Sequence, residues 1–336
     1  MTELLKRLCT LDGISGDEGS VREFIISEIK DFCEWRTDNL GNIIAFKKGD
    51  KKPAKKILLD AHMDEVGLII TSITEKGFLN FTTVGGIETE ALLFRAVKIN
   101  DKINGVISGK PIHLLSGDEG KKPPKTDSLY IDIGADSKQE AEKYLSVGDS
   151  AVICGGFTEN GQKVISKALD DRVGCAVLIE LIKSYSEYDF YVSFSVQEEI
   201  GVRGARTAAY SVNPDCAIVI DGTTAADIAD TPEDKTVCKQ GEGPAVSFMD
   251  RATVYDKSFY NAALKSGITC QPKAAVAGGN NAAAIHLSRE GVRTAAISVP
   301  CRYIHSAASV ADKADIENTL RLLKFMLNGI ASGEIE

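Results

Sequence analysis

The chain has 336 residues, of which 43% are hydrophobic and 26% are charged, so it is long enough for one large globular domain or two smaller ones. Lys and Arg together number 39 and Asp and Glu number 48, which gives a formal net charge of -9 at pH 7. Because an acidic surface repels phosphate groups, nucleic acids and anionic membranes are not expected partners.

The first residues, MTELLKRLCTLDG, carry charges throughout and lack the apolar stretch of a secretory signal. No later window approaches the roughly 18 consecutive apolar residues of a membrane span. The 8 cysteines stand far apart and form no CxxC pair, which favours buried, reduced thiols over disulfides. Together these observations predict a cytoplasmic protein.

Two helical patterns open the chain, one in the first eleven residues and one over residues 21–32, where apolar residues recur at helical spacing. A turn rich in Lys, Gly and Pro follows and precedes the apolar run 57–59. This run predicts a fully buried strand, with His62 and Asp64 at or just past its carboxyl end.

Between about residues 66 and 153 the pattern changes to short alternating stretches separated by turns, with one helical segment near 138–145. We expect a small β-barrel-like domain over 67–159, inserted into a catalytic domain formed by 1–66 and 160–336. Exposed strand edges in a unit of this size would favour self-association, so a role in dimerisation is expected.

After residue 161, strand and helix patterns alternate. Residues 173–182 have a helical stripe, 190–196 alternate as a strand, and CAIVID, PAVSFMD and RTAAISVP are short apolar runs before a last amphipathic helix over 316–330. This alternation predicts an α/β fold, a wound mixed sheet with helices on both faces.

Five polar segments follow these apolar runs or open a helix, and the carboxyl ends of neighbouring strands in such a sheet meet at one edge. Two imidazoles and several carboxylates without a cysteine suit a pair of Zn²⁺, Co²⁺ or Mn²⁺ ions, which would offset the repulsion between the acids. The segments are DAHMDEVG (His62, Asp64), KALDDRVG (Asp170, Asp171), VQEEIGVRG (Glu198, Glu199), IVIDGTTAAD (Asp221) and CRYIHSAAS (His305).

Two of these segments allow a geometric prediction. His62 and Asp64 lie on the same side of an extended chain, so Asp64 can accept the second imidazole N–H and fix the tautomer. Glu198 and Glu199 would point to opposite faces of a continuous strand, so both reach one site only where the strand ends. Ile200-Gly201 supplies such an end.

The ordered set AHMDEVG, SKALDDRVG, QEEIGVRGA, IVIDGTTAAD and ISVPCRYIHS resembles the dinuclear metallo-aminopeptidases of the tetrahedral (TET) type, a family with glutamyl aminopeptidases and members labelled endoglucanase. The resemblance implies that Asp170, four residues before Gly174, bridges two metal ions. It further implies a cis peptide bond after Asp170 and Glu198 as general base. The other ligands would be His62 and Asp221 at one ion, and Glu199 and His305 at the other.

The same resemblance implies an aminopeptidase that removes the N-terminal residue of short peptides, using a metal-bridging water activated by Glu198. We expect two divalent ions per subunit, Zn or Co with Mn as the alternative, and dimers assembled into a twelve-subunit shell. The chain departs from the family at 278–282, where Gly-Gly-Asn-Asn-Ala replaces Gly-Gly-Thr-Asp-Ala, and at Cys301 and Ala307, which replace Thr and Pro.

Three alternatives stay open at this point. Cys301 and His305 would form a thiol hydrolase pair only on a helix, whereas Pro300 follows a strand-like run. A glycoside hydrolase would need paired carboxylates facing a sugar, yet the chain has a single Trp, Trp35. A non-catalytic scaffold stabilised by metal is the third alternative.

The remaining polar residues carry weaker signals. Arg302 is expected in a surface ion pair rather than on substrate, and His113 and His286 in structural roles. The sequence does not show whether Lys167 pairs with a carboxylate.

Overall fold

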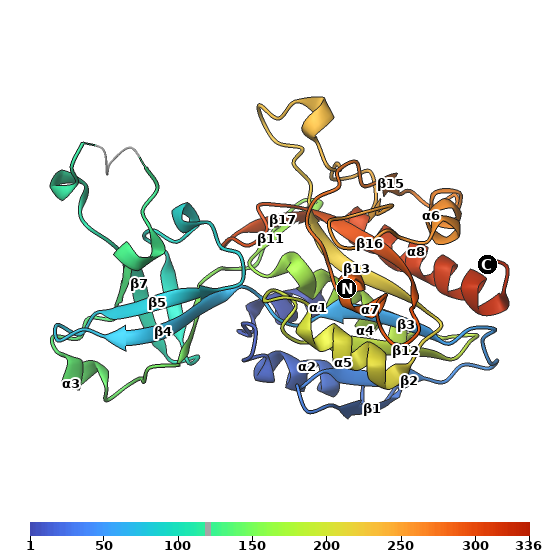
Figure 1. Cartoon of the computed structure of the whole chain (residues 1–336), viewed down its shortest axis with the longest axis horizontal. Coiled ribbons are helices and arrows are strands. Elements are labelled where there is room, and N and C mark those ends of the chain that lie inside the picture. The colour runs from blue at the N-terminus through green and yellow to red at the C-terminus, as the bar shows by residue number, and fades with distance from the viewer. Residues whose placement is uncertain (118–121) are drawn as a thin grey trace.

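The computed structural model describes residues 1–117 and 122–336 and shows a large mixed sheet beside a closed six-stranded barrel (Figure 1). This confirms the predicted α/β fold with a barrel-like insert. The strands of the large sheet, in spatial order, are β1 (Glu34–Thr37), β2 (Ile43–Lys47), β12 (Phe190–Ser195), β3 (Ile57–His62), β13 (Cys216–Thr224), β16 (Arg293–Arg302), β17 (Ser309–Asp312), β11 (Lys163–Ser166) and β10 (Thr158–Asn160), with β14 (Ala245–Val246) and β15 (Gln271–Pro272) beside β16.

The middle of the sheet is parallel and buried on both faces. All six residues of β3 are buried, and its side chains alternate between two cores, so Leu59 packs on one face and Leu58 on the other. β12 and β13 pair with β3 in parallel, and β16 pairs with β13 in parallel. The carboxyl ends of these four strands therefore share one edge.

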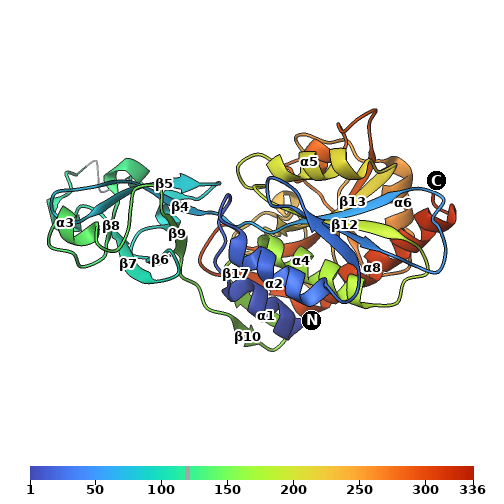
Figure 2. The same cartoon turned by 90° about the horizontal axis from the view of Figure 1, so that it is seen from below.

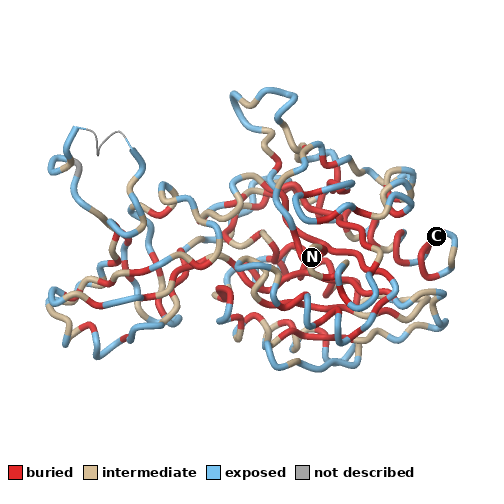
Figure 3. Tube along the Cα trace, in the orientation of Figure 1, coloured by how far each residue is buried: buried red, intermediate tan, exposed pale blue. Residues whose placement is uncertain are grey.

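Helices cover both faces of this sheet, as predicted (Figure 2). The larger core lies under α1 (Thr2–Thr10), α2 (Gly19–Ile29), α4 (Leu169–Lys183) and α8 (Lys313–Ser332), and the smaller under α5 (Arg203–Val212) and α7 (Ala282–Ile285). A further helix, α6 (Lys257–Leu264), contacts α8, β14 and β16. The buried part of the trace is concentrated in this sheet and its helices (Figure 3).

The barrel consists of short antiparallel strands around a core of its own. Because it closes on itself, its strands leave no long free edge, so the edge-based argument for self-association was wrong. The strands, in spatial order, are β4 (Gly67–Ile73), β5 (Leu79–Val84), β8 (Tyr130–Asp132), β7 (Ile103–Ser108), β6 (Ala96–Ile99) and β9 (Ser150–Ile153), and the helix α3 (Lys138–Ala141) lies between β8 and β9 in the chain. That 67–159 is a separate dimerisation domain stays a prediction.

None of the helices in the described ranges combines the length and hydropathy of a membrane span. All eight cysteines are described, and each is a free thiol.

Candidate metal centre

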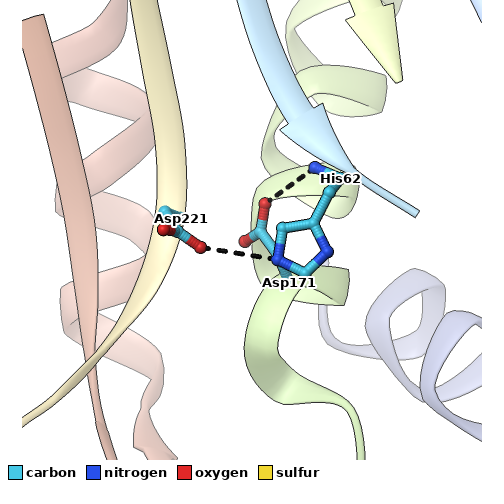
Figure 4. Close-up of side chains that lie close together, drawn as sticks. All are labelled: His62, Asp171 and Asp221. Carbon is cyan, nitrogen blue, oxygen red and sulfur yellow. Dashed lines mark hydrogen bonds and ion pairs between the residues drawn. The ribbon is translucent and has the colours of Figure 1, made fainter. Parts of the chain in front are cut away.

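The first half of the site is formed by two neighbouring parallel strands. The last paired residues of β3 and β13 are Asp60 and Val219, and two residues further along each strand come His62 and Asp221. Nε2 of His62 lies 3.6 Å from Oδ1 of Asp221, and both residues are buried (Figure 4). The strand register thus places an imidazole against a carboxylate at the carboxyl edge of the sheet.

The second half is formed by the segments that follow β12 and β16. Nε2 of His305 lies 3.3 Å from Oε2 of Glu199. His305 has a φ of 59°, so the backbone turns sharply behind the imidazole. A second imidazole and carboxylate pair therefore lies at the same sheet edge.

Asp170, at the start of α4, lies between the two halves. Its Oδ1 is 3.3 Å from Nε2 of His62, and its Oδ2 is 3.7 Å from Nε2 of His305. The structure thus brings all five predicted ligands together, with one carboxylate shared between two histidines.

The neighbouring acid, Asp171, has a different environment. The peptide bond between Asp170 and Asp171 is cis, as expected. The carboxylate of Asp171 accepts hydrogen bonds from the main-chain N–H of His62 (3.2 Å, Figure 4) and of Gly174 (3.0 Å). Asp171 is therefore engaged in holding the backbone of β3 and α4, which leaves Asp170 as the acid that faces both histidines.

Asp64 is fully buried and holds several parts of the site. Its carboxylate accepts hydrogen bonds from Oγ of Ser15 (2.6 Å) and from the main-chain N–H groups of Glu198 (3.0 Å) and Glu199 (3.1 Å). Nδ1 of His62 lies 3.1 Å from the carbonyl oxygen of Asp64 and 3.4 Å from its Oδ1. Because both neighbours of Nδ1 are acceptors, Nδ1 carries a proton, and Nε2 is the nitrogen that faces Asp170 and Asp221.

The position of Glu198 and Glu199 corrects one detail of the sequence prediction. β12 ends at Ser195, before the predicted break at Ile200-Gly201, and Gln197 adopts a left-handed φ of 56°. The carboxylate of Glu18 accepts the N–H of Gln197 at 3.1 Å. Three consecutive N–H groups of this turn are thus held by buried carboxylates, which is how adjacent glutamates reach one site.

Sequence analysis missed Glu18 and Ser15. Both lie in the segment between α1 and α2, more than a hundred residues from the turn that Glu18 holds, and no spacing rule links such distant residues. The only local signal was a polar and Gly-rich stretch, ISGDEGS, between two helical patterns.

The electrostatics of the site follow from burial and from this pairing. Removal from water raises the pKa of Glu198 well above its usual range, and the carboxylates of Asp221 and Glu199 add to this. Burial lowers the pKa of His305, but the hydrogen bond and charge of Glu199 outweigh it and raise the pKa to about 9. Burial raises the pKa of Asp170, but His62 outweighs it and brings the pKa to about 2. The cluster therefore favours positive charge between its carboxylates.

The residues present fit a pair of divalent cations. Nε2 of His62 faces oxygens of Asp170 and Asp221, an arrangement that needs positive charge, either from a proton on Nε2 or from a cation between the groups. Two ligands of a tetrahedral zinc, each about 2.0 to 2.2 Å from the ion, lie about 3.3 to 3.6 Å apart. The distances between 3.3 and 3.7 Å around both histidines are of this size.

Asn280 and Asn281 replace Thr and Asp of the family pattern, and Asn281 lies next to β3. Nδ2 of Asn281 donates to Oδ2 of Asp60 (2.7 Å) and to Oγ of Ser195 (2.7 Å), and Oγ of Ser193 also donates to Asp60. Asn281 is therefore bound to a buried acid of β3, where an aspartate would bring two carboxylates together.

Other predicted residues lie outside the cluster. Arg302 forms a two-bond ion pair with Asp227 (2.8 and 2.9 Å), as expected. Nζ of Lys167 pairs with Glu65 (2.6 Å) rather than with the clustered acids, and Nδ1 of His286 contacts the carbonyl of Ala282 (2.7 Å). His113 is exposed in the turn 112–114.

The thiol hydrolase alternative does not fit this geometry. Cys301 is buried within β16 and paired with β17, and burial raises the pKa of its thiol well above the usual range. The imidazole of His305 faces Glu199 and Asp170 instead. A thiol held neutral and away from the histidine cannot serve as the nucleophile.

The sequence is similar to aminopeptidases from several organisms. A putative aminopeptidase of Acetivibrio thermocellus is 41% identical over 96% of this chain and 97% of its own. The lysyl aminopeptidase of Pyrococcus furiosus is 33% identical over 97% and 96%, and the glutamyl aminopeptidase of Lactococcus lactis is 28% identical over 98% and 97%. The class of protein is therefore an aminopeptidase, a hydrolase of peptide bonds.

Solved structures agree with this class. An aminopeptidase from Desulfurococcus kamchatkensis has a TM-score of 0.94 at 34% identity and covers 100% of this chain and 96% of its own. The TET1 peptidase of Pyrococcus horikoshii, which assembles into a tetrahedron or a large octahedral shell, has a TM-score of 0.85 at 36% identity over 96% and 98%. A Thermotoga maritima structure called an endoglucanase has a TM-score of 0.82 at 35% identity over 99% of both chains.

Residues 41–322 match the M42 glutamyl aminopeptidase family. The chain belongs to this family, and the predicted resemblance to TET peptidases is confirmed.

Proposed function

We propose that this chain is a dinuclear metal-dependent aminopeptidase that removes the N-terminal residue from short peptides. One observation carries the proposal. The carboxylate of Asp170 lies between His62 and His305, and each histidine also faces a carboxylate of its own, Asp221 or Glu199. Two ligand sets that share one carboxylate would hold two divalent ions side by side, His62 and Asp221 on one side of Asp170 and Glu199 and His305 on the other.

When bound, two divalent ions supply Lewis-acid polarisation of the scissile carbonyl and lower the pKa of water toward neutrality. Glu198, which stands beside this cluster with a raised pKa, takes the proton of the attacking water on its carboxylate. The same carboxyl group then donates that proton to the leaving amine. Asp64 holds the N–H of Glu198 and the tautomer of His62, so it positions both groups.

A cavity of about 250 Å³ opens onto the cluster and accommodates the first residue of a peptide. The free α-amino group of the substrate would bind among the clustered carboxylates, which restricts attack to the first peptide bond. An N-acetylated peptide is therefore expected not to be hydrolysed, whereas the same peptide with a free amine is cleaved.

The endoglucanase label of a related structure does not favour a glycosidase here. The residues that line the cavity include no Trp, Tyr or Phe on which a sugar ring could stack, within the described part of the chain. The clustered acids instead lie against two histidines, an arrangement that glycoside hydrolysis does not require.

We also propose that the subunits form dimers through the barrel and assemble into a twelve-subunit shell. Support comes from relatives, since a TET1 structure of the same family is a dodecamer. Such a shell would admit short, unfolded peptides to the metal centres.

The test uses protein stripped of metal and refilled separately with Zn²⁺, Co²⁺ or Mn²⁺. We expect two ions per chain by elemental analysis, together with restored hydrolysis of aminoacyl p-nitroanilides. Hydrolysis that persists in the stripped protein with chelator would contradict the proposal, as would metal binding and raised thermal stability without turnover, which the scaffold alternative predicts.

A further inference from the structure

A lysine lies in the wall of the cavity that opens onto the metal centre. Lys273 follows β15, and its main-chain N–H bonds to the carbonyl of Val246, so its backbone is fixed to β14. Its side chain lines the cavity although the residue is only 7% exposed. Lys273 is thus held by the sheet with its side chain at the cavity.

The ammonium group of Lys273 has no carboxylate partner. Nζ donates to the carbonyl oxygen of Ala277 at 3.3 Å, and no carboxylate of the described residues lies within 4.0 Å of it. An ammonium group has three donors, and a buried charge is costly unless it is paired. Most of the donor capacity and all of the charge of Lys273 are therefore available to a ligand.

Among the described lining residues, Lys273 is the single charged group outside the candidate metal centre. Apart from Lys273 and the clustered acids and histidines of the candidate metal centre, the described lining residues are neutral, among them Thr223, Thr224, Gly278 and Ile304. A substrate side chain that extends from the metal centre to Lys273 therefore meets one positive group among neutral residues.

We infer that Lys273 determines specificity and selects substrates whose N-terminal residue carries a side-chain carboxylate, Glu or Asp. The inference rests on the proposed function, because it places the first residue of the peptide in this cavity. A glutamyl carboxylate would pair with Lys273, whereas a lysyl side chain would be repelled. The related aminopeptidases include both a lysyl and a glutamyl enzyme, so their names do not decide the preference.

The test compares Glu and Gln p-nitroanilides, which have nearly the same shape and differ in charge, on the metal-loaded full chain. We expect kcat/KM for the Glu substrate to exceed that for Gln at least tenfold, and free glutamate to inhibit more strongly than free glutamine. Lys273→Met should bring the ratio to within threefold of one through loss on the Glu substrate. Lys273→Arg, which keeps the charge, should retain the preference, and Lys273→Glu should favour the Lys substrate.

Equal rates on Glu and Gln substrates in the unmodified enzyme would overturn the inference, as would an unchanged ratio in Lys273→Met. Should Lys273→Met fail to fold, the ratios for Lys273→Arg and Lys273→Glu decide, since the inference requires them to differ. Absence of cleavage of every aminoacyl substrate with every metal would instead overturn the proposed function, so the two failures are distinguishable.

Discussion

The side chain of Asp64 connects three parts of the site through a single carboxylate. It accepts the N–H groups of Glu198 and Glu199, accepts the Ser15 hydroxyl, and lies beside Nδ1 of His62. A substitution of Asp64 is therefore expected to affect both His62, a predicted metal ligand, and Glu198, the proposed base. The positioning role and the role of the base can be separated experimentally, because Glu198 takes part in the turn through its main chain and its side chain can be exchanged alone.

Glu198→Gln tests the proposed base. The substitution keeps the shape of the side chain but removes its capacity to accept the proton of water, so kcat should fall by about 10²- to 10⁴-fold. Metal content per chain should be unchanged by elemental analysis. Retention of more than a tenth of the activity would contradict the assignment.

Asp64→Asn tests the positioning role. An amide removes the negative charge beside the Nδ1–H of His62 and one acceptor of the Glu198 turn, and such partners of metal ligands typically change metal affinity or activity by about 10- to 100-fold. We expect this loss in metal affinity, measured by titration of stripped protein. Ser15→Ala, which removes only a neutral donor to the same carboxylate, is the matched control and should cost less than tenfold.

At the scale of elements, hydrophobic periodicity predicted most of the fold. The buried run at 57–59, the helical stripe at 173–182 and the last amphipathic helix correspond to β3, α4 and α8. Burial on one or both faces is a local property of the sequence, so it can be read from spacing. The convergence of strand ends then follows from the parallel order of the sheet.

Features that depend on contacts between distant segments could not be predicted in this way. β12 ends at Ser195 because Glu18 and Asp64 hold the following turn, and closure of the barrel depends on pairing between strands far apart in the sequence. The ion-pair partners of Lys167 could likewise not be predicted from its neighbours in the sequence. The site residues could be predicted from the order of the motifs, whereas the groups that hold them in place could be identified only in the structure.

The N-terminus of α6 allows a prediction of stability against pH. Asp256 accepts the N–H groups of Ser258 and Phe259 and pairs with Nε of Arg293 at 2.7 Å. Burial raises the pKa of Asp256, but the hydrogen bonds of Arg293 and Ser258 outweigh it and lower the pKa to about 2. Because the folded pKa is depressed, this contribution is present above the usual pKa of Asp and is lost as pH falls toward 2.

Asp256→Ala should therefore lower the free energy of unfolding by about 0.5 to 2 kcal/mol at pH 7. The difference from the unmodified chain should shrink steadily below about pH 4, as measured by urea unfolding over a pH series. Asp234→Ala is the control, since Asp234 is 76% exposed in its ion pair with Lys235 and should have no measurable effect. A difference that grows at low pH would contradict the prediction.

For the whole molecule, the exposed surface of the barrel is relevant to the assembly of subunits. The closed barrel exposes Phe94 (73%) and Val106 (45%), which lie near each other because the N–H of Phe94 bonds to the carbonyl of Ile107. Exposed aromatic and aliphatic side chains of this kind are typical of surfaces that other subunits cover.

Light scattering should give a mass of twelve times the 36.1 kDa chain if the proposed shell forms. Charged residues at both barrel positions, Phe94→Asp with Val106→Asp, should reduce the mass to smaller species while hydrolysis of p-nitroanilides remains. A chain that is monomeric at micromolar concentration before any substitution would contradict the proposed assembly.

The passage from β3 into the barrel is short and buried. Only residues 63–66 separate His62 from Gly67, and within them Met63, Asp64 and Glu65 are buried, with Glu65 bound to Lys167 and Arg172. Such a segment acts as a stiff joint rather than a flexible tether. In the proposed assembly, contacts that fix the barrel would therefore also fix the direction in which the mouth of the cavity faces, so the packing of subunits would set the approach route of a peptide.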